Sequence, residues 1–182
     1  MRTIRVPADR VGTLIGKNGE TKKALQKASG IKIDINTEDG EVVIHDDVEL
    51  EDPVMALKIL DVVKAVGRGF NPDKAMRLFD DDEYLEVVDI KEFVGDRSSQ
   101  VARVRGRLIG KNGKTRRIIE DLTGCDMVIY GNTAALIGNS ISLPVAKHAV
   151  EMLLSGSEHA TVYHYLESQR PMLRISEMGF DL

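Results

Sequence analysis

This sequence of 182 residues has one cysteine, no tryptophan and no long apolar run. Its single cysteine, Cys125, excludes an intramolecular disulfide and a multi-cysteine zinc site, and a reducing cytoplasm is the expected compartment. Four Phe, four Tyr and no Trp argue against a carbohydrate cleft and against RNA binding through aromatic platforms. No apolar segment has the length of a membrane span, and the N-terminus lacks the apolar stretch of a signal peptide, so we expect no membrane partner.

Residues that would support catalysis or hold a metal ion are equally scarce. The four histidines show no ligand spacing, and Cys125 falls on an alternating strand pattern that predicts a buried thiol. The consecutive carboxylates of Asp80–Glu83 point in different directions, which favours a solvated linker over a metal-dependent nuclease site. No Ser-His-Asp set or pair of catalytic acids emerges. We therefore predict a protein that is not an enzyme and that needs no metal or cofactor.

The distribution of charge is more informative than its sum. The net charge of −4 argues mildly against a nucleic-acid partner. However, residues Asp34–Asp52 contain nine acids and no Lys or Arg, whereas Arg97–Ile119 contain eight bases and no acid. A local basic patch can therefore exist on a protein that is acidic overall.

The hexapeptide LIGKNG occurs twice, at Leu14–Gly19 and at Leu108–Gly113. Aligning Gly16 with Gly110 gives an offset of 94 (110 − 16), and nine of the 22 positions from Leu14 and from Leu108 onward are then identical. The segment DPVMALKILDVVKAV, which contains Pro53, also resembles LPVAKHAVEMLLSG, which contains Pro144. The repeat therefore spans a whole folding unit.

Each copy predicts the element order β-α-loop-α-β-β-α, the loop being GKNG. In the first copy RTIRVP, IKIDIN and EVVIH alternate as strands, Asp9 can cap a short helix that runs into the loop, and Gly30 ends the next one. Pro53 stands where an N1 proline would open the closing helix. In the second copy the helix before the loop is predicted to be longer.

The predicted fold class is α+β, with two such units in tandem, each a three-stranded sheet covered by helices. We expect a first unit at residues 1–70, a linker at 71–83, a second unit at 84–156, and a C-terminal helix and tail at 157–182. The linker is expected to contain a short helix around Lys74–Phe79. The C-terminal helix, near Glu158–Gln169, is expected to end before Pro171 and has no counterpart in the first copy.

The GKNG loops have the chemistry of a phosphate grip. Two glycines let the backbone turn sharply without a side chain in the way, and the helix that follows offers free N–H groups and a positive dipole end. Lys17 and Lys111 add a cation, and Asn18 and Asn112 add amide donors. A tight surface turn would explain one copy, but a turn needs only its glycines and here Lys and Asn recur as well.

A nucleotide-hydrolysing P-loop is improbable. Gly12–Asn18 has three residues between its glycines instead of four, and Asn18 replaces the Ser or Thr that would hold magnesium. Gly106–Asn112 departs from the P-loop pattern in the same two ways.

A Gly-x-x-Gly loop between two helices in this element order resembles the KH domain, in the type I arrangement that ends in β-α. RGRLIGKNGKTRR followed by IIEDLTG is similar to archaeal two-KH proteins related to the eukaryotic small-subunit processing factors called partner of Nob and Krr. The resemblance covers about residues 2–170. It implies binding of single-stranded RNA, with the loop clamping about four nucleotides. It further implies a target in ribosomal RNA near the small-subunit 3′ end, and a role in ribosome biogenesis.

The expected RNA-binding residues lie in and around the two loops. In the first copy they are Ile15, Gly16, Lys17, Asn18, Gly19, Lys22, Lys23 and Ile33, and in the second they are Arg103, Arg105, Arg107, Ile109, Gly110, Lys111, Asn112, Gly113, Lys114, Arg116 and Arg117. Leu14, Ile15 and Ile33, with Leu108, Ile109 and Met127 in the second copy, are expected to form an apolar groove for bases. We expect the second copy to bind more tightly, because Glu20 dilutes the positive field of the first.

Three other functions remain open at the level of sequence. The chain could be an accessory RNA-binding subunit of an RNA-degradation complex, or a general binder of single strands. It could also be a scaffold that binds a processing endonuclease or a translation initiation factor through its acidic faces around Asp34–Asp52.

Overall fold

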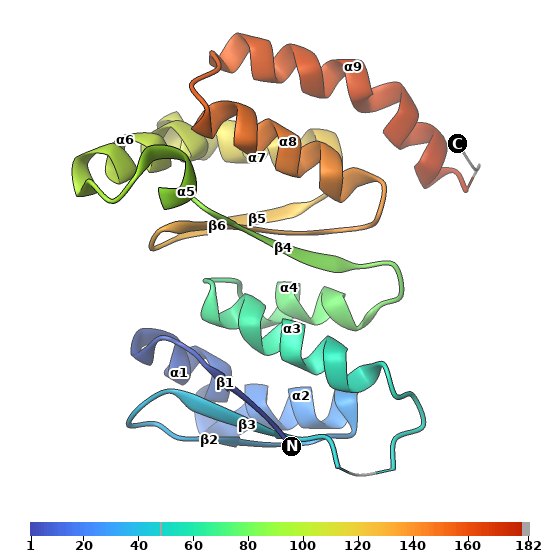
Figure 1. Ribbon diagram of the computed structural model, residues 1–182. Coiled ribbons are helices and arrows are strands. Elements are labelled where there is room, and N and C mark those ends of the chain that lie inside the picture. Colours follow the sequence, from blue (N-terminus) through green and yellow to red (C-terminus); the bar gives the residue numbers. More distant parts are fainter. Residues whose placement is uncertain (48, 180–182) are drawn as a thin grey trace. The chain divides into compact units, whose positions relative to one another are not determined.

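The computed structural model describes residues 1–47 and 49–179. The chain divides into two compact units, Met1–Glu83 and Tyr84–Leu182. Each contains a three-stranded antiparallel sheet covered by helices (Figure 1). The predicted α+β class with two tandem KH-like units is confirmed.

The described part of the first unit contains three strands and the helices that follow or separate them. In chain order these are β1 (Arg2–Arg5), α1 (Ala8–Ile15), the 3₁₀ turn η1 (Lys17–Gly19), α2 (Glu20–Ser29), β2 (Lys32–Ile35), β3 (Glu41–His45), α3 (Met55–Gly67), α4 (Pro72–Ala75) and the 3₁₀ helix η2 (Met76–Phe79).

The second unit repeats this order and extends it at both helical ends. Its elements are β4 (Tyr84–Asp89), α5 (Lys91–Val94), α6 (Ser98–Ile109), the 3₁₀ turn η3 (Lys111–Gly113), α7 (Lys114–Thr123), β5 (Asp126–Tyr130), β6 (Thr133–Gly138), α8 (Ser142–Leu154) and α9 (His159–Glu177). The longer pre-loop helix and the extra C-terminal helix were both predicted, and α9 lies along α7 and α8 (Figure 1).

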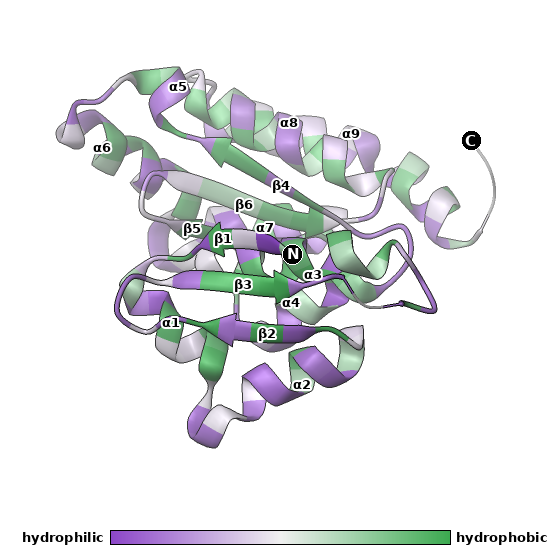
Figure 2. Cartoon of the chain, turned by 60° about the horizontal axis from the view of Figure 1, so that its bottom comes forward, coloured by the Kyte–Doolittle hydropathy of each residue, from purple (hydrophilic) through white to green (hydrophobic). Residues whose placement is uncertain are grey.

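The third strand of each unit occupies the centre of its sheet. The strand orders are β1-β3-β2 and β4-β6-β5. The strands β2 and β5, which follow the two helices on either side of the loop, are therefore edge strands. In β3, Val42 and Ile44 are fully buried and alternate with half-buried neighbours, because successive side chains point to opposite faces. Figure 2 shows hydrophilic and hydrophobic residues following one another along α2, as expected of a helix with one polar and one apolar side.

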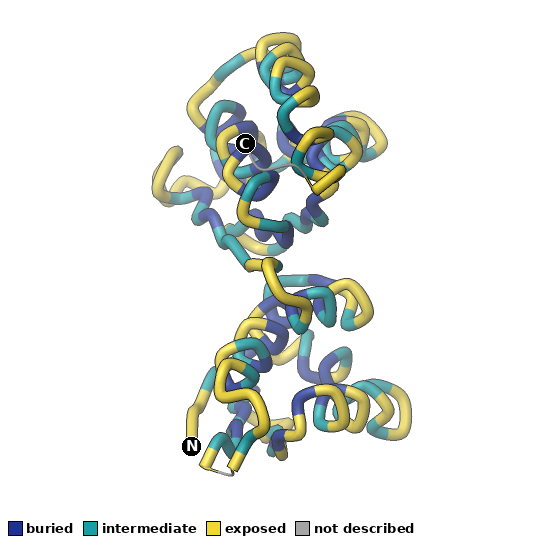
Figure 3. Tube along the Cα trace, turned by 90° about the vertical axis from the view of Figure 1, so that its right-hand side faces the viewer, coloured by how far each residue is buried: buried dark blue, intermediate teal, exposed yellow. Residues whose placement is uncertain are grey.

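Each unit has its own hydrophobic core between the sheet and its helices, drawn dark blue in Figure 3. In the second unit the core joins Leu108 of α6, Ile119 of α7 and Leu136 of β6 to the closing helices. Leu166 and Leu173 bring α9 into this core, each at most 4% exposed. The C-terminal helix is therefore an integral part of the second unit.

Two helices of the first unit, α1 and α3, start differently from the sequence prediction. Pro7, and not Asp9, precedes α1, and no side chain caps that helix; Asp9 lies in its first turn. The helix α3 begins at Met55, two residues after Pro53, so the proline lies in the turn before it and not at N1.

Residues 71–83, predicted to form a linker, are folded onto the first unit. The expected short helix is present as α4 and η2, and Ala75 and Leu78 are buried against α3. Asn71 caps α4 by accepting from the backbone N–H of Asp73 at 2.9 Å. The division between the two units accordingly falls after Glu83.

The prediction that the C-terminal helix ends before Pro171 was wrong. The helix α9 continues through Pro171 to Glu177, although proline in a helix interior costs about 3 kcal/mol. Pro171 is exposed, whereas Leu173 and Met172, just beyond it, pack against the core. Burial of these side chains outweighs the lost backbone hydrogen bond. Residues 180–182 of the predicted tail lie outside the described residues.

One ion pair ties the end of the first unit to α3 and predicts how that unit responds to pH. The ammonium of Lys58 lies 2.7 Å from Asp81 Oδ1 and also donates to the carbonyl of Phe79. The hydrogen bond between them raises the pKa of Lys58 above its ordinary 10.5 and lowers the pKa of Asp81 below its ordinary 3.8. The pair therefore stabilises the fold between these values.

We expect Lys58→Met to lower the midpoint of urea unfolding at neutral pH by a small amount, since Asp81 is exposed and its interaction is screened. The deficit should disappear as pH falls through the lowered pKa of Asp81, and also as pH rises through the raised pKa of Lys58. Unfolding followed by far-ultraviolet circular dichroism across pH measures this. Lys64→Met, on the exposed side of the same helix, is the control. A deficit that persists in acid would contradict the assignment.

Candidate nucleic-acid interface

The two GKNG loops have the same backbone conformation. In the first loop, Gly16 has φ 75° and ψ 173°, Asn18 φ 53° and ψ 25°, and Gly19 φ 75° and ψ 14°. In the second loop the corresponding glycines and Asn112 differ from these values by at most 5°. The repeated sequence therefore encodes one repeated structure.

The first glycine of each loop is required for a steric reason as well as a conformational one. Gly16 and Gly110 adopt a backbone conformation found almost only in glycine. A Cβ on Gly16 would lie 2.8 Å from the backbone nitrogen of Thr21, and one on Gly110 would lie 2.7 Å from that of Thr115. The helix that follows each loop can approach this closely only because no side chain stands there.

The loops present the donors that a phosphate needs. Lys17, Asn18, Lys111 and Asn112 are all exposed. The helices α2 and α7 begin directly after the loops, and no side chain of the N-cap residues Gly19 and Gly113 caps them. The N–H groups of Gly113 and Lys114 donate to the carbonyls of Gly110 and Lys111, and the first loop has the same two bonds. The helices therefore offer an anion the positive end of their dipoles.

The bases around the second loop divide between two faces of α6. Arg105 lies on one face, where it lines a hollow of about 230 Å³ together with Ala102 and Asn132. Its Nε is buried and has no hydrogen-bond partner among the described residues. Arg103 and Arg107 lie on the other face, toward α9. These residues, predicted as one cluster, therefore face two directions.

Two of the residues predicted to contact RNA bond through their guanidinium groups to other residues of the protein. The guanidinium of Arg107 donates to the carbonyl of Leu153 at 2.6 Å and to that of Ser157, so it closes the C-terminal end of α8. Arg116 pairs with Glu120 at 3.2 Å. These bonds give Arg107 a structural role, and its contact with RNA stays a prediction.

Arg117 supports the loop itself. Its guanidinium donates to the carbonyl of Asn112 at 3.0 Å from an exposed position. This bond stabilises the left-handed conformation of Asn112 while leaving the other nitrogens of Arg117 toward solvent.

The expected apolar groove differs from the observed surface. Ile33, Leu14 and Leu108 are 0% exposed and Met127 is 2% exposed, so none of them can touch a base. They belong to the cores and support the loops from beneath. Ile15 and Ile109, which immediately precede the loops, are half-buried and retain apolar surface beside them. The apolar contribution to the interface is therefore smaller than the sequence predicted.

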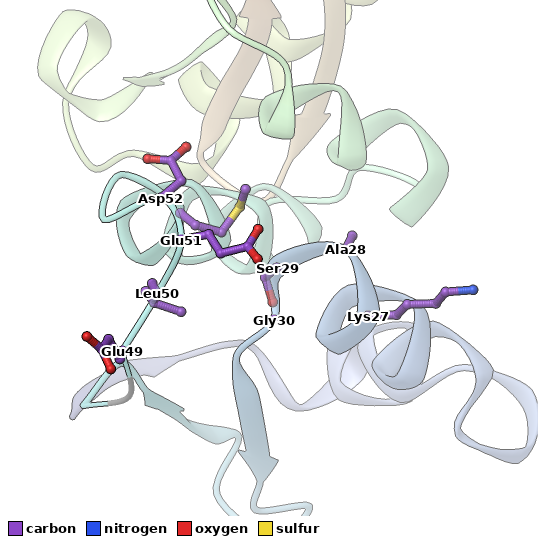
Figure 4. A pocket seen from close by; sticks show the side chains of 9 residues that line it. Lys27, Ala28, Ser29, Gly30, Glu49, Leu50, Glu51 and Asp52 are labelled. Atoms are coloured by element: carbon purple, nitrogen blue, oxygen red, sulfur yellow. The ribbon is translucent and has the colours of Figure 1, made fainter.

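The first unit is less basic around its loop. On α2, Lys23 is exposed and Lys22 is half-buried. The positive charge of Lys22 is one of the groups that lower the pKa of Asp34, after the hydrogen bond from His45. At the far end of α2 a hollow of about 340 Å³ is lined by acids from the segment before α3, and Figure 4 shows the carboxylates of Glu49, Glu51 and Asp52 there. These acids repel a polyanion and limit any RNA path along this side of the unit.

Sequence reasoning missed two residues of α9 that hold the second loop. Nε2 of His159 lies 3.0 Å from the carbonyl of Arg107, which can only accept, so the imidazole donates. The hydroxyl of Tyr163 lies 2.9 Å from Oγ1 of Thr115 in the first turn of α7. Their spacing of four residues on one predicted helix was the available signal, but nothing in the sequence placed that helix beside the loop.

Residues 1–47 and 49–179 contain no group of three or more His, Cys, Asp or Glu side chains that could hold a metal ion. Within the same residues, no helix is both long and apolar enough to cross a membrane.

Comparison with known proteins adds to this geometry. Residues 84–171 match the family model described as the eukaryotic type KH-domain (KH-domain type I), and residues 1–50 match the KH domain model. The chain is 45% identical to a KH domain-containing protein of Methanocaldococcus jannaschii, over 94% of this chain and 74% of that one. It is 27% identical to the pre-rRNA-processing protein pno1 of Schizosaccharomyces pombe, over 92% of this chain and 70% of the relative.

A solved structure resembles the whole chain. A crystal structure of the a/eIF2alpha–aDim2p–rRNA complex from Pyrococcus horikoshii contains a chain that is 44% identical and superposes with a TM-score of 0.89. The match covers 94% of this chain and 94% of that one.

Proposed function

The chain belongs to the KH-domain family that includes archaeal Dim2 and eukaryotic PNO1 proteins, and from this premise we propose that it binds single-stranded ribosomal RNA during maturation of the small ribosomal subunit. The observation that carries the proposal is the second GKNG loop. It combines an uncapped helix N-terminus with an exposed Lys111 and Asn112, in a stretch of chain that has eight bases and no acid. A relative is named for pre-rRNA processing, and a similar chain was solved in a complex with rRNA.

We propose that the target lies near the 3′ end of the small-subunit rRNA. Crosslinking RNA to the protein in cells and sequencing the products tests this. The expected result is one peak at that rRNA end, reduced by substitutions in the second loop. A diffuse profile over many RNAs would instead support a general binder of single strands, and enrichment of decay intermediates would support the accessory subunit of a degradation complex.

Binding should depend on salt, because the loops hold phosphates through cations and backbone N–H groups. If three or four phosphates are neutralised, log K should fall against log salt concentration with a slope of about −2 to −3. Fluorescence anisotropy of labelled single-stranded RNA at several potassium chloride concentrations measures the slope. An affinity that does not change with salt would contradict a phosphate grip.

A second function, binding a translation initiation factor, is favoured by one observation. The similar Pyrococcus chain was solved together with a/eIF2alpha. The acids between β3 and α3 give this chain a negative surface in the first unit, and a basic face on a factor would complement it. Charge reversal of Glu49, Glu51 and Asp52 to lysine should weaken capture of that factor without lowering RNA affinity. A processing endonuclease as partner stays a prediction.

A further inference from the structure

A hollow of about 480 Å³ lies between α6, the second loop and α9; we refer to it as the α6–α9 hollow. It is on the opposite face of α6 from Arg105. Its lining residues are Arg103, Gly106, Arg107, Gly110, Lys111, Lys114, Thr115, His159 and Tyr163. The absence of a side chain at Gly106 and Gly110 keeps the floor of the hollow open.

Three cations line this hollow without an acid to neutralise them. Arg103, Lys111 and Lys114 are exposed, and none of them forms an ion pair within residues 1–47 and 49–179. Arg103 bonds only to the side-chain amide of Gln100, at 3.2 Å. An uncompensated group of three cations around a concave surface favours a polyanionic ligand.

The first unit carries the opposite charge at two of the three corresponding positions. With the offset of 94, Arg103 aligns with Asp9 and Lys114 aligns with Glu20. The helix α9, which supplies one wall of the hollow, has no counterpart in the described part of the first unit. A loop grip alone would not need these differences, because both loops have the same backbone. At these two positions the second unit has positive charge beside its loop where the first unit has negative charge.

The walls of the hollow are held in place by hydrogen bonds across it. His159 bonds to the end of α6, Tyr163 bonds to the start of α7, and Arg107 joins α6 to the connection between α8 and α9. The imidazole of His159 and the ring of Tyr163 lie 6.0 Å apart and are both half-buried. The site is therefore organised before any ligand arrives, which lowers the cost of binding.

We propose that the α6–α9 hollow binds the sugar-phosphate backbone of the nucleotides that continue beyond those clamped by the second loop. Lys111 belongs both to the loop and to the lining of the hollow, so one RNA strand can pass from the first to the second without leaving positive potential. This inference rests on the proposed function and extends it: the second unit reads a longer stretch of RNA than one KH loop, which clamps about four nucleotides.

The test uses the full chain with its first loop silenced by Lys17→Asp and Asn18→Asp, so that length dependence cannot come from the first unit. Affinity is measured by competition with RNAs from the small-subunit 3′ end, shortened stepwise from about twelve nucleotides to the four that one loop clamps. Adding Arg103→Glu and Lys114→Glu should lower the affinity for the longest RNA by about tenfold, since two phosphate contacts become repulsive. The loss for the tetranucleotide should be clearly smaller, because Lys111 and Asn112 still hold it and only Lys114 directly borders the loop.

The substitution at Lys114 should not disturb folding, because Glu20 occupies the same position at the start of α2 and acids favour a helix N-terminus. Arg170→Glu with Arg174→Glu, both exposed toward the far end of α9, is the charge-matched control and should leave both affinities in place. Equal losses for short and long RNA, or no loss for either, would overturn the inference and leave the loop function intact. If the chain in which only the first loop is silenced binds neither the short nor the long RNA, the proposed function fails, and the inference with it.

Discussion

Replacing Lys111 and Asn112 by aspartate is expected to lower the affinity for single-stranded RNA by about a hundredfold. Two hydrogen bonds to phosphate are lost, each worth about 1.5–3 kcal/mol for a bond to a charged group; at the lower end of that range the two amount to about two decades in the dissociation constant. The new carboxylates also repel the strand at the positive end of the α7 dipole. Anisotropy titration with labelled rRNA 3′-end oligonucleotides measures the change.

The matched variant carries Lys17→Asp and Asn18→Asp in the first loop, whose backbone is the same. We expect a smaller loss there, about tenfold, since the surrounding field is weaker where Glu20 follows the loop. All four side chains are exposed, so circular dichroism should show both proteins folded. Equal losses in the two variants, or a larger loss in the first loop, would refute the ranking of the loops.

The second large effect is on stability: Gly110→Ala should destabilise the second unit by about 2–4 kcal/mol. The backbone of Gly110 lies in a region that costs an L-residue on the order of 1–3 kcal/mol. The added Cβ would also press on the backbone nitrogen of Thr115, 2.7 Å away, and Thr115 is buried and bonded to Tyr163. Urea unfolding followed by circular dichroism reports the loss.

Gly113→Ala is the control in the same loop. Gly113 is left-handed, but only the far end of the Arg116 side chain, at 3.9 Å, would approach its Cβ. The expected cost is about 1–2 kcal/mol, the strain of the left-handed backbone alone. If the two substitutions cost the same, close approach of α7 to the loop is not what requires glycine at position 110.

The fold could be predicted from the sequence because the same pattern of residues occurs twice in the chain. Two copies of one hydrophobic alternation, with LIGKNG, Gly30 and Gly124 in register, define strand, helix and loop without further information. The errors fell at element ends. Pro53 and Pro171 were interpreted by local rules, and burial of Leu173 and its neighbours overrode the second of them.

The positions of the expected interface residues agree with the sequence prediction in outline and differ from it in detail. The loop residues are exposed as expected, whereas Ile33 is in the core and Arg107 serves the end of α8. Counting bases along Arg97–Ile119 could not distinguish these roles, because adjacent positions on a helix face different directions.

The sequence by itself determined the two-unit KH architecture, the identity of both loops and the concentration of positive charge around the second one. Tertiary structure alone decided which of those charges remain free and which surface they border. The reason is distance along the chain: His159 and Tyr163 lie about fifty residues from Arg107 and Thr115, and only the packing of α9 on α7 and α8 joins them. Local patterns determine a helix, whereas contacts between helices determine what its side chains can bind.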